Sequence, residues 1–237
     1  MASRFPGFSA EGIDFLRSLA RNNHRDWFLP RKHIFEEQVK GPMNELVEAV
    51  NRAMAAFAPD FVTDPAKAVF RIYRDTRFSK DKKPYKEHIA ANFRRRGGGP
   101  HEGGGYYFAI SHKSVAVGGG LYMPAPETLL AVRNHIAGHH AELRKVTASR
   151  TVRKLLGEMQ GERLSRVPKG FPADHPAADL LRFKSFIFYT ELEPEIATTP
   201  NLLREILERF RAISPFVEFL NAPVVNARKK IDARDLL

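Results

Sequence analysis

The spacing of apolar residues changes along this chain of 237 residues, and that change most limits the folds open to it. Up to Phe57, and over most of the chain after Pro126, apolar side chains recur every three or four positions, as in amphipathic helices. Within 66–122 and over 183–192, apolar and polar residues alternate, or β-branched and aromatic residues cluster, as in strands. Strands concentrated between two helical parts are typical of an α+β fold.

We therefore expect a single α+β domain over residues 1–237. A central antiparallel sheet of about five strands would pack against helices from the N- and C-terminal parts. The tail after about residue 222 is expected to be loosely attached. The strands are expected at 67–75, 86–94, 106–111, 114–123 and 183–192.

The alternation in the first two of these strands separates charge from apolar side chains. In 67–75, the residues Ala68, Phe70 and Ile72 would face the core. In 86–94, the core face would carry Ile89 and Phe93. If these strands are antiparallel neighbours, their other faces form one surface that holds Arg71, Tyr73, Asp75, Lys86, His88, Asn92 and Arg94.

Positive charge is concentrated in the same part of the sequence. The whole chain has a formal net charge of +11. The 30 residues of 67–96 contain 11 Lys or Arg and 3 acidic residues, so they carry +8 of that charge. A local excess of this kind creates a positive field that attracts anions. A solvated face with incidental ion pairs is the ordinary alternative.

This pattern predicts an anion-binding surface built as a strand, a loop and a second strand. Arginine offers a planar fork to phosphate or carboxylate, and lysine offers a point charge. Pro84 near the end of the loop restricts its backbone, so the loop is expected to have a defined shape. The predicted binding residues are Arg71, Tyr73, Arg74, Arg77, Lys80, Lys82, Lys83, Tyr85, Lys86, Asn92 and Arg94.

Three functions are compatible with such a surface. The first is binding of a phosphorylated or polyanionic ligand, nucleic acid included. The second is a metal-assisted phosphoester hydrolase or transferase, with Asp75, Asp81 and His88 as candidate catalytic residues and Mg²⁺ as the cofactor of that alternative alone. The third is a scaffold that binds an acidic protein partner.

Other features narrow the chemistry. The chain has no cysteine, which excludes disulfides, thiolate nucleophiles and cysteine-based metal sites, and favours a reducing cytoplasm. No apolar run approaches the roughly 20 residues that span a bilayer, so no membrane association is expected. His135 and His139 have a metal-ligand spacing, but the spacing fits a solvated helix face better, and no metal site is predicted. The glycines in "GGGLYMP" form either a bulge or the wall of a site.

Several stretches together resemble one uncharacterised family. They are "FRIYRDTRFSKDKKPYKEHIAANFRR", "GGGLYMPAPETL" and "RVPKGFPADHPAADLLRFKSF", and the likeness extends from "FPGFSAEGIDFLRSL" to about residue 220. The family that they resemble is DUF2461, a domain of unknown function. The resemblance implies one intact domain. It implies no mechanism, so no catalytic residue is carried over from it.

Overall fold

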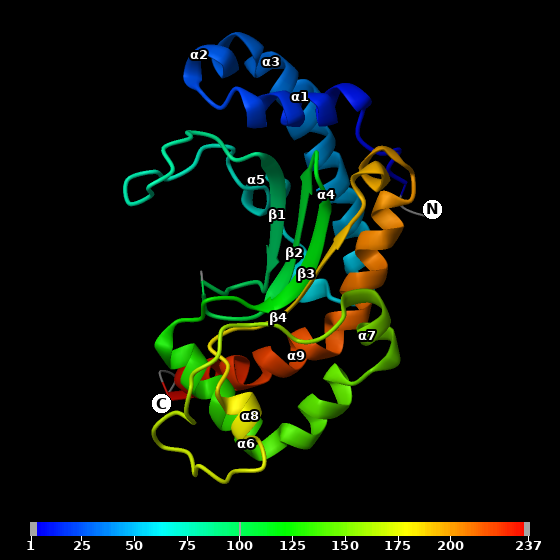
Figure 1. Cartoon of the computed structure of the whole chain (residues 1–237). Coiled ribbons are helices and arrows are strands. Elements are labelled where there is room, and N and C mark those ends of the chain that lie inside the picture. Colours follow the sequence, from blue (N-terminus) through cyan, green and yellow to red (C-terminus); the bar gives the residue numbers. More distant parts are fainter. Residues whose placement is uncertain (1–3, 100, 235–237) are drawn as a thin grey trace. The chain divides into compact units, whose positions relative to one another are not determined.

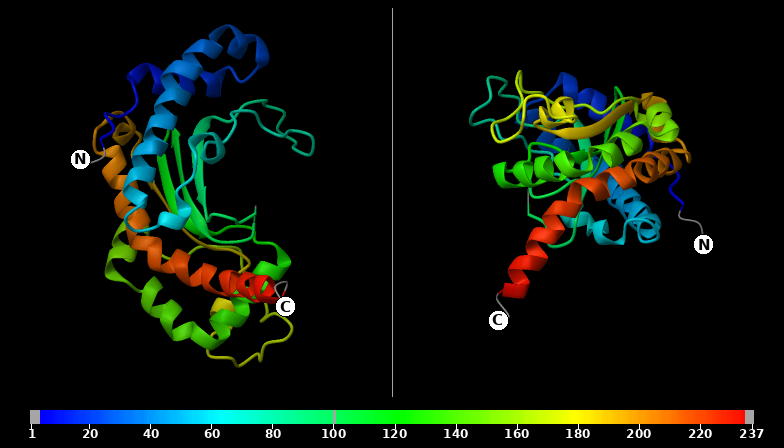
Figure 2. Two further views of the ribbon diagram at one scale, coloured as in Figure 1. Left: turned by 180° about the vertical axis from the view of Figure 1, so that it is seen from behind. Right: turned by 90° about the horizontal axis from the view of Figure 1, so that it is seen from below.

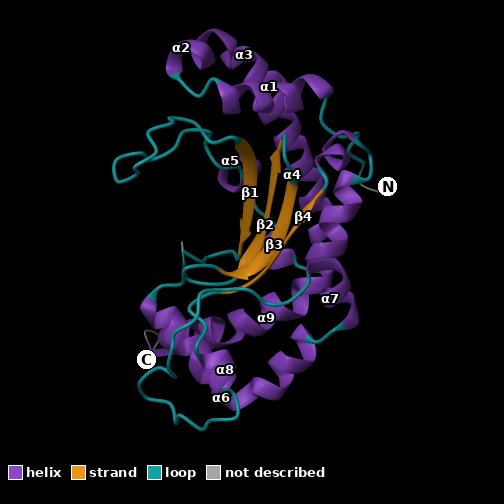
Figure 3. Ribbon diagram, in the orientation of Figure 1, coloured by secondary structure: helices purple, strands orange, loops and turns teal. Residues whose placement is uncertain are grey.

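Four antiparallel strands form one sheet in the order β1-β2-β3-β4, with helices on both sides (Figures 1 and 3). The computed structural model describes residues 4–99 and 101–234, and side-chain surroundings up to residue 225. The expected α+β class is confirmed, with one strand fewer than predicted. The strands are β1 (His88–Arg94), β2 (Gly105–Ser111), β3 (Val115–Leu121) and β4 (Phe186–Leu192).

The strand predicted over 67–75 is wrong. Residues Pro65–Ala68 form the short helix α5, whose first turn is capped because the Asp64 side chain accepts a hydrogen bond from the Ala66 N–H. Beyond it only two isolated antiparallel bridges form, Val69 with Ala91 and Tyr73 with Tyr85. The bridges are four positions apart on one side and six on the other, so a regular ladder cannot join them.

The predicted core face of this segment is also wrong at one position. Ala68 and Ile72 are buried, but Phe70 is 39% exposed. The bridge between Val69 and Ala91 places these two residues on one face, so their neighbour Phe70 points to the other. A helix at the start of the segment and a bulge at its end shift the alternation that the sequence indicated.

The described chain separates into two compact units, each built from three segments. The first unit comprises residues 1–93, 107–117 and 191–208. Its helical elements are α1 (Ala10–Arg21), α2 (Arg25–Phe28), η1 (Leu29–Arg31), α3 (Lys32–Ile34), η2 (Phe35–Lys40), α4 (Gly41–Met54), η3 (Pro59–Phe61), α5 and η4 (Pro194–Thr198).

An aromatic cluster fills the N-terminal part of the first unit. The Phe15 ring lies 6.2 Å from Phe28 and 6.1 Å from Phe35, and these two are 5.7 Å apart. Phe28 is fully buried, and Phe15 and Phe35 are nearly so. Farther along the unit, Phe93 of β1 stacks on Phe108 of β2 at 5.9 Å. The contacts of Phe28 with Phe15 and Phe35 hold the helical turn that supports the site described below.

The second unit comprises residues 94–106, 118–190 and 209–237. It contains α6 (Pro126–Thr147), α7 (Arg150–Leu156), α8 (Ala178–Leu181) and most of α9 (Leu202–Arg234). Phe188 packs edge-on against Phe216, and the Tyr106 hydroxyl lies 2.7 Å from the Ser214 hydroxyl. The tail from 222 to 234 is helical; its side chains from 226 on lie outside the described residues, so loose attachment remains a prediction.

The glycine run of β3 has a packing role. A Cβ on Gly118 would lie 2.4 Å from the Phe188 carbonyl oxygen. A Cβ on Gly120, whose φ is +124°, would lie 2.1 Å from the Phe186 carbonyl oxygen. Only glycine allows β3 and β4 to approach this closely. The close approach of β4 therefore accounts for Gly118 and Gly120 without a bulge or a bound ligand.

Candidate anion-binding site

Residues 71–87, which we call the arm, leave β1 as a two-sided loop (Figure 1). Both further views show the arm projecting away from the strand (Figure 2). Its halves are joined by the bridge between Tyr73 and Tyr85. Backbone hydrogen bonds flank this bridge, from the Arg74 N–H to the Pro84 carbonyl at 2.9 Å and from the Lys86 N–H to the Ile72 carbonyl at 2.8 Å. The arm is thus antiparallel at its root without being a regular hairpin.

One asparagine from a distant part of the sequence docks the arm. The Asn23 side chain accepts a hydrogen bond from the Tyr85 N–H and donates one to the Tyr85 carbonyl, both at 3.0 Å. A side-chain amide that satisfies both backbone groups of one residue acts as a substitute β-bridge. The turn between α1 and α2 therefore holds the second half of the arm in place.

Aromatic packing strengthens this attachment. Tyr85 is 1% exposed, and its ring stacks on Phe28 with centroids 4.1 Å apart and an interplanar angle of 25°. Tyr73 lies 5.5 Å from Tyr85 and is 43% exposed. Burial raises the pKa of the Tyr85 hydroxyl, the nearby Tyr73 adds to the rise, and Arg25 opposes it. Both predicted binding tyrosines thus belong to the root of the arm, and Tyr85 is a core residue.

Asp75 forms an ion pair within the outer part of the arm. Its Oδ1 accepts hydrogen bonds from the Arg77 backbone N–H at 3.2 Å and from Nε at 3.0 Å, and its Oδ2 accepts one from the same guanidinium at 2.7 Å. The side-chain bond from Arg77 is the main reason that the Asp75 pKa falls from 3.8 to about 2. Asp75 therefore shapes the turn and neutralises Arg77.

Asp81 and Glu87 neutralise two further cations. Asp81 accepts hydrogen bonds from Arg74 at 2.6 Å and from the Lys83 N–H at 3.0 Å, which lower the pKa of its carboxyl group. Lys83 pairs with Glu87 at 2.8 Å. All three acidic residues of the arm are thus occupied by cations of the arm itself.

Four cations of the arm have no such partner in the described part of the chain. They are Arg71, Lys80, Lys82 and Lys86. Lys80 and Lys82 are exposed, and the Lys82 ammonium donates a hydrogen bond to the Thr76 carbonyl at 3.0 Å. Arg71 and Lys86 lie at the root. The positive charge available to a ligand therefore divides between the outer arm and its root.

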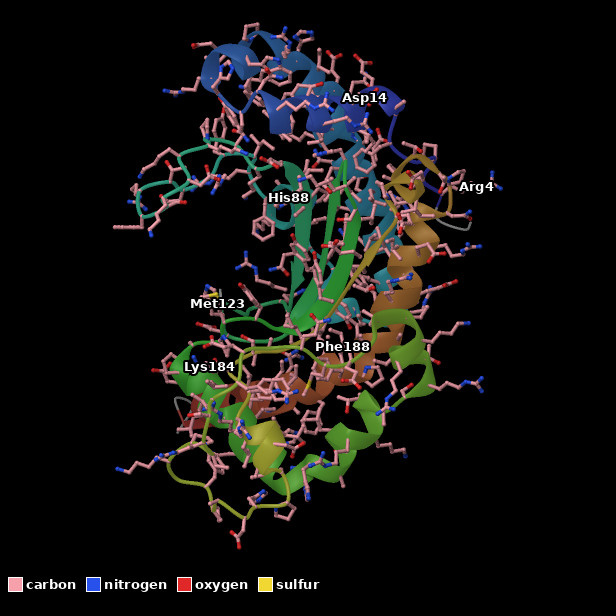
Figure 4. All side chains as sticks on the ribbon, viewed as in Figure 1. Arg4, Asp14, His88, Met123, Lys184 and Phe188 are labelled. Atoms are coloured by element: carbon pink, nitrogen blue, oxygen red, sulfur yellow. The ribbon has the colours of Figure 1, made fainter. Side chains whose placement is uncertain are left out.

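Arg71, Lys86 and His88 form what we call the root cluster. The Lys86 ammonium donates to the Arg71 carbonyl at 2.8 Å and lies 5.1 Å from the centre of the Phe70 ring. Burial, and secondarily the positive charge of Arg71, lowers the pKa of Lys86. Burial also lowers the pKa of His88, and Lys86 lowers it further while Glu87 opposes the change. Figure 4 labels His88 where the arm joins β1.

The root cluster is bordered by aromatic side chains. Phe70 lies 6.4 Å from Tyr107, and burial raises the pKa of the Tyr107 hydroxyl. Strand alternation places Asn92, which is half-buried, on the same face of β1 as His88. The combination of two unpaired cations, a half-buried imidazole and partly exposed rings is suited to an anion that needs both charge and desolvation.

Arg94, the last residue of β1, belongs to different surroundings. It lines a pocket of the second unit with Gly98, Gly103 and Asn221, and no arm residue takes part in that lining. The Asn221 amide donates to the Gly104 carbonyl at 3.1 Å, which ties the glycine-rich loop to α9. None of the other predicted binding residues is among those that line this pocket.

Across the described ranges, no group of three or more His, Asp or Glu residues could hold a metal ion. The rings of His135 and His139 are 4.4 Å apart, and His139 Nδ1 lies 3.0 Å from the His135 carbonyl oxygen. This pair packs on itself and on Phe219, 4.5 Å from His135.

The sequence did not identify four residues that support the arm or lie beside the root cluster. Asn23 and Phe28 support the arm from 62 and 57 positions away, a separation at which no local pattern operates. The sequence pattern predicts Phe70 as a core residue and Tyr107 simply as a strand residue. For Phe70 a signal existed, because Pro65 and Asp64 form a helix start that interrupts the assumed alternation.

Comparison with known proteins identifies one family. The model of the family described as "Conserved hypothetical protein (DUF2461)" matches residues 11–219. No curated protein and no solved structure matches the chain. Within the residues that the structure describes, none of the helices has both the length and the apolar character needed to traverse a bilayer.

Proposed function

This chain belongs to the DUF2461 family, and we propose that it binds a phosphorylated or polyanionic ligand through the root cluster of the arm. The observation that carries the proposal is the pairing pattern. Each carboxylate of the arm forms an ion pair with Arg74, Arg77 or Lys83, whereas neither Arg71 nor Lys86 forms one within the described residues. Asp75 is paired with Arg77 and reaches Arg71 only through a weaker electrostatic attraction.

Electrostatics explains why this arrangement favours an anion. Two like charges held together raise the energy of the folded arm, and partial burial of Lys86 weakens its solvation. A phosphate between the two cations would remove both penalties and form charge-assisted hydrogen bonds. His88 would donate an additional hydrogen bond once protonated, and an adjacent anion favours that protonation.

The enzyme alternative receives less support from the same contacts. Both oxygens of Asp75 and both oxygens of Asp81 already accept hydrogen bonds from arm residues. These carboxylates are committed to the shape of the arm, and their cationic partners would have to be displaced before Mg²⁺ could bind. An acidic protein partner would satisfy the exposed Arg71, but the half-buried Lys86 and His88 are more accessible to a small anion than to a protein surface.

Binding of tripolyphosphate, measured by calorimetry at roughly 0.15 M salt, where electrostatic effects are screened over about 8 Å, tests this proposal. The double variant Arg71→Gln/Lys86→Gln should weaken binding by about 10- to 100-fold, because two charge-assisted contacts are lost. The matched control Lys80→Gln/Lys82→Gln removes the same charge from unpaired lysines of the outer arm and should change affinity by less than about threefold. Equal losses in the two variants, or no binding by the wild type, would reject the root cluster as the site.

A further inference from the structure

The outer end of the arm presents a single aromatic ring to solvent. Phe78 lies at the turn over residues 77–78 and is 95% exposed, more than any other large apolar residue of the described chain. Isolated exposed apolar residues are common on protein surfaces. Phe78 differs from these because it lies in the turn near the middle of the arm, a segment otherwise rich in cations. Figure 1 shows that this segment projects as a loop.

The tip has a defined local structure. Asp75 holds the Arg77 guanidinium with two side-chain hydrogen bonds, and that guanidinium lies 5.8 Å from the centre of the Phe78 ring. The Ser79 N–H donates to the Thr76 carbonyl at 3.3 Å, and Lys82 donates to the same oxygen. These contacts hold Phe78 outward, with Lys80 and Lys82 exposed next to it.

We propose that the arm binds single-stranded nucleic acid, with the ring of Phe78 stacking on a base and the unpaired cations contacting the backbone phosphates. This inference rests on the proposed function, because the root cluster would hold one phosphate of the same strand. It names the ligand class and adds Phe78, which charge alone would not select. Aromatic side chains among cations are the usual means of binding single strands with little sequence preference.

Alternative partners match the tip less well. In a duplex the faces of the bases are covered by their neighbours, and inserting a ring requires a base step to be unstacked. An acidic protein surface offers carboxylates for the lysines but no flat aromatic face for the exposed ring. A single strand offers both a phosphate backbone and accessible base faces.

Fluorescence anisotropy with labelled oligothymidylate tests the inference on the full-length chain. Phe78→Ala should weaken binding by roughly 5- to 100-fold, the range for loss of one base–aromatic stack. Phe78→Leu keeps an apolar side chain without a ring and should weaken binding similarly, whereas Phe78→Trp should bind at least as tightly as the wild type. Because Phe78 is almost fully exposed, these variants should fold normally, as urea unfolding would verify.

Two controls separate this inference from the proposed function. Tripolyphosphate has no base, so its affinity should be the same in Phe78→Ala and the wild type. Tyr122→Ala removes another exposed aromatic residue, 65% exposed and part of the second unit, and should leave oligothymidylate binding unchanged.

Several results would overturn the stacking assignment while leaving tripolyphosphate binding intact. One is wild-type affinity of Phe78→Ala for oligothymidylate, and another is a lack of oligothymidylate binding by a protein that binds tripolyphosphate. Duplex DNA bound as tightly as the single strand, with an equal loss in Phe78→Ala, would reject the single-stranded assignment. If the wild-type protein does not bind tripolyphosphate at all, the proposed function itself is rejected.

Discussion

The root and the outer part of the arm contain the same kinds of residue but use them differently. In the outer part, Arg74 and Arg77 each bind an aspartate, so charge there mainly shapes the loop. At the root, neither Arg71 nor Lys86 forms an ion pair within the described residues, and Lys86 lies near the half-buried His88. Cation density therefore does not identify a binding site; the decisive property is which cations the fold leaves unpaired.

The two tyrosines of the root bridge provide the largest test of this contrast. Tyr85→Ala should lower the free energy of unfolding by about 3–5 kcal/mol, as for other buried aromatic truncations. Tyr73→Ala should cost clearly less, because its ring is 43% exposed. Urea unfolding measures both.

A conservative variant isolates the role of the Tyr85 ring. Arg25 lies near enough to the Tyr85 hydroxyl to lower its pKa, but no hydrogen bond of ordinary geometry reaches that hydroxyl from the described residues. Tyr85→Phe should therefore unfold within about 0.5 kcal/mol of the wild type, since no satisfied polar group is lost. If it were as destabilised as Tyr85→Ala, the hydroxyl rather than stacking on Phe28 would hold the arm.

The Asn23 bridge is expected to give the next largest effect. Asn23→Ala leaves both backbone groups of Tyr85 without their partner and should cost about 1–3 kcal/mol in unfolding free energy. It should also weaken tripolyphosphate binding, because the root cluster loses its support. Asn22→Ala is the matched control, because the Asn22 side chain donates to the Ser18 carbonyl at the end of α1 and not to the arm. Similar ligand affinities in the two variants would separate the docking of the arm from its binding function.

The outer part predicts a clear change in titration. The Asp75 pKa of about 2 lies below its ordinary value of 3.8, so the folded state favours the carboxylate. Its contribution to stability is fully present above the ordinary pKa and is lost as pH falls through 2. In Arg77→Gln the pKa, followed by carboxyl carbon NMR, should rise toward 3.8, and the retained backbone N–H of residue 77 should keep it below that value. An unchanged value would contradict the assignment of the shift to Arg77.

At the root we predict a smaller change in pKa, at a group whose neutral form the fold favours. The folded state lowers the His88 pKa below 6.5 and so favours neutral imidazole, a contribution that is present above 6.5 and lost as pH falls through the folded pKa. Lys86→Gln should raise this pKa, because one neighbouring cation is removed. Tripolyphosphate should also raise it, so wild-type affinity should increase as pH falls below 6.5. Histidine NMR and calorimetry measure these effects, and His88→Gln should lose most of the pH dependence of binding.

Local patterns predicted much of the fold. The strands β1 to β4 lie within or next to the expected segments, because alternation and β-branched runs are properties of neighbouring residues. The prediction of a strand over 67–75 was wrong because the capped helix α5 and the unequal spacing of the two bridges interrupt the alternation. For the same reason the sequence wrongly predicted Phe70 to face the core, whereas it lies beside Lys86 of the root cluster.

The sequence alone determined the element types, the family and the concentration of charge in one segment, since composition and periodicity are readable from adjacent residues. Only the tertiary structure decided how that charge is used. Asn23 and Phe28 meet Tyr85 across about 60 positions, and hydrogen-bond geometry within the arm assigns Asp75 and Asp81 to particular arginines. Which carboxylate pairs with which cation depends on distances of a few ångströms, and the same sequence would allow several different pairings. For that reason the unpaired cations of the root, and the exposed ring at the tip, became visible only in the folded chain.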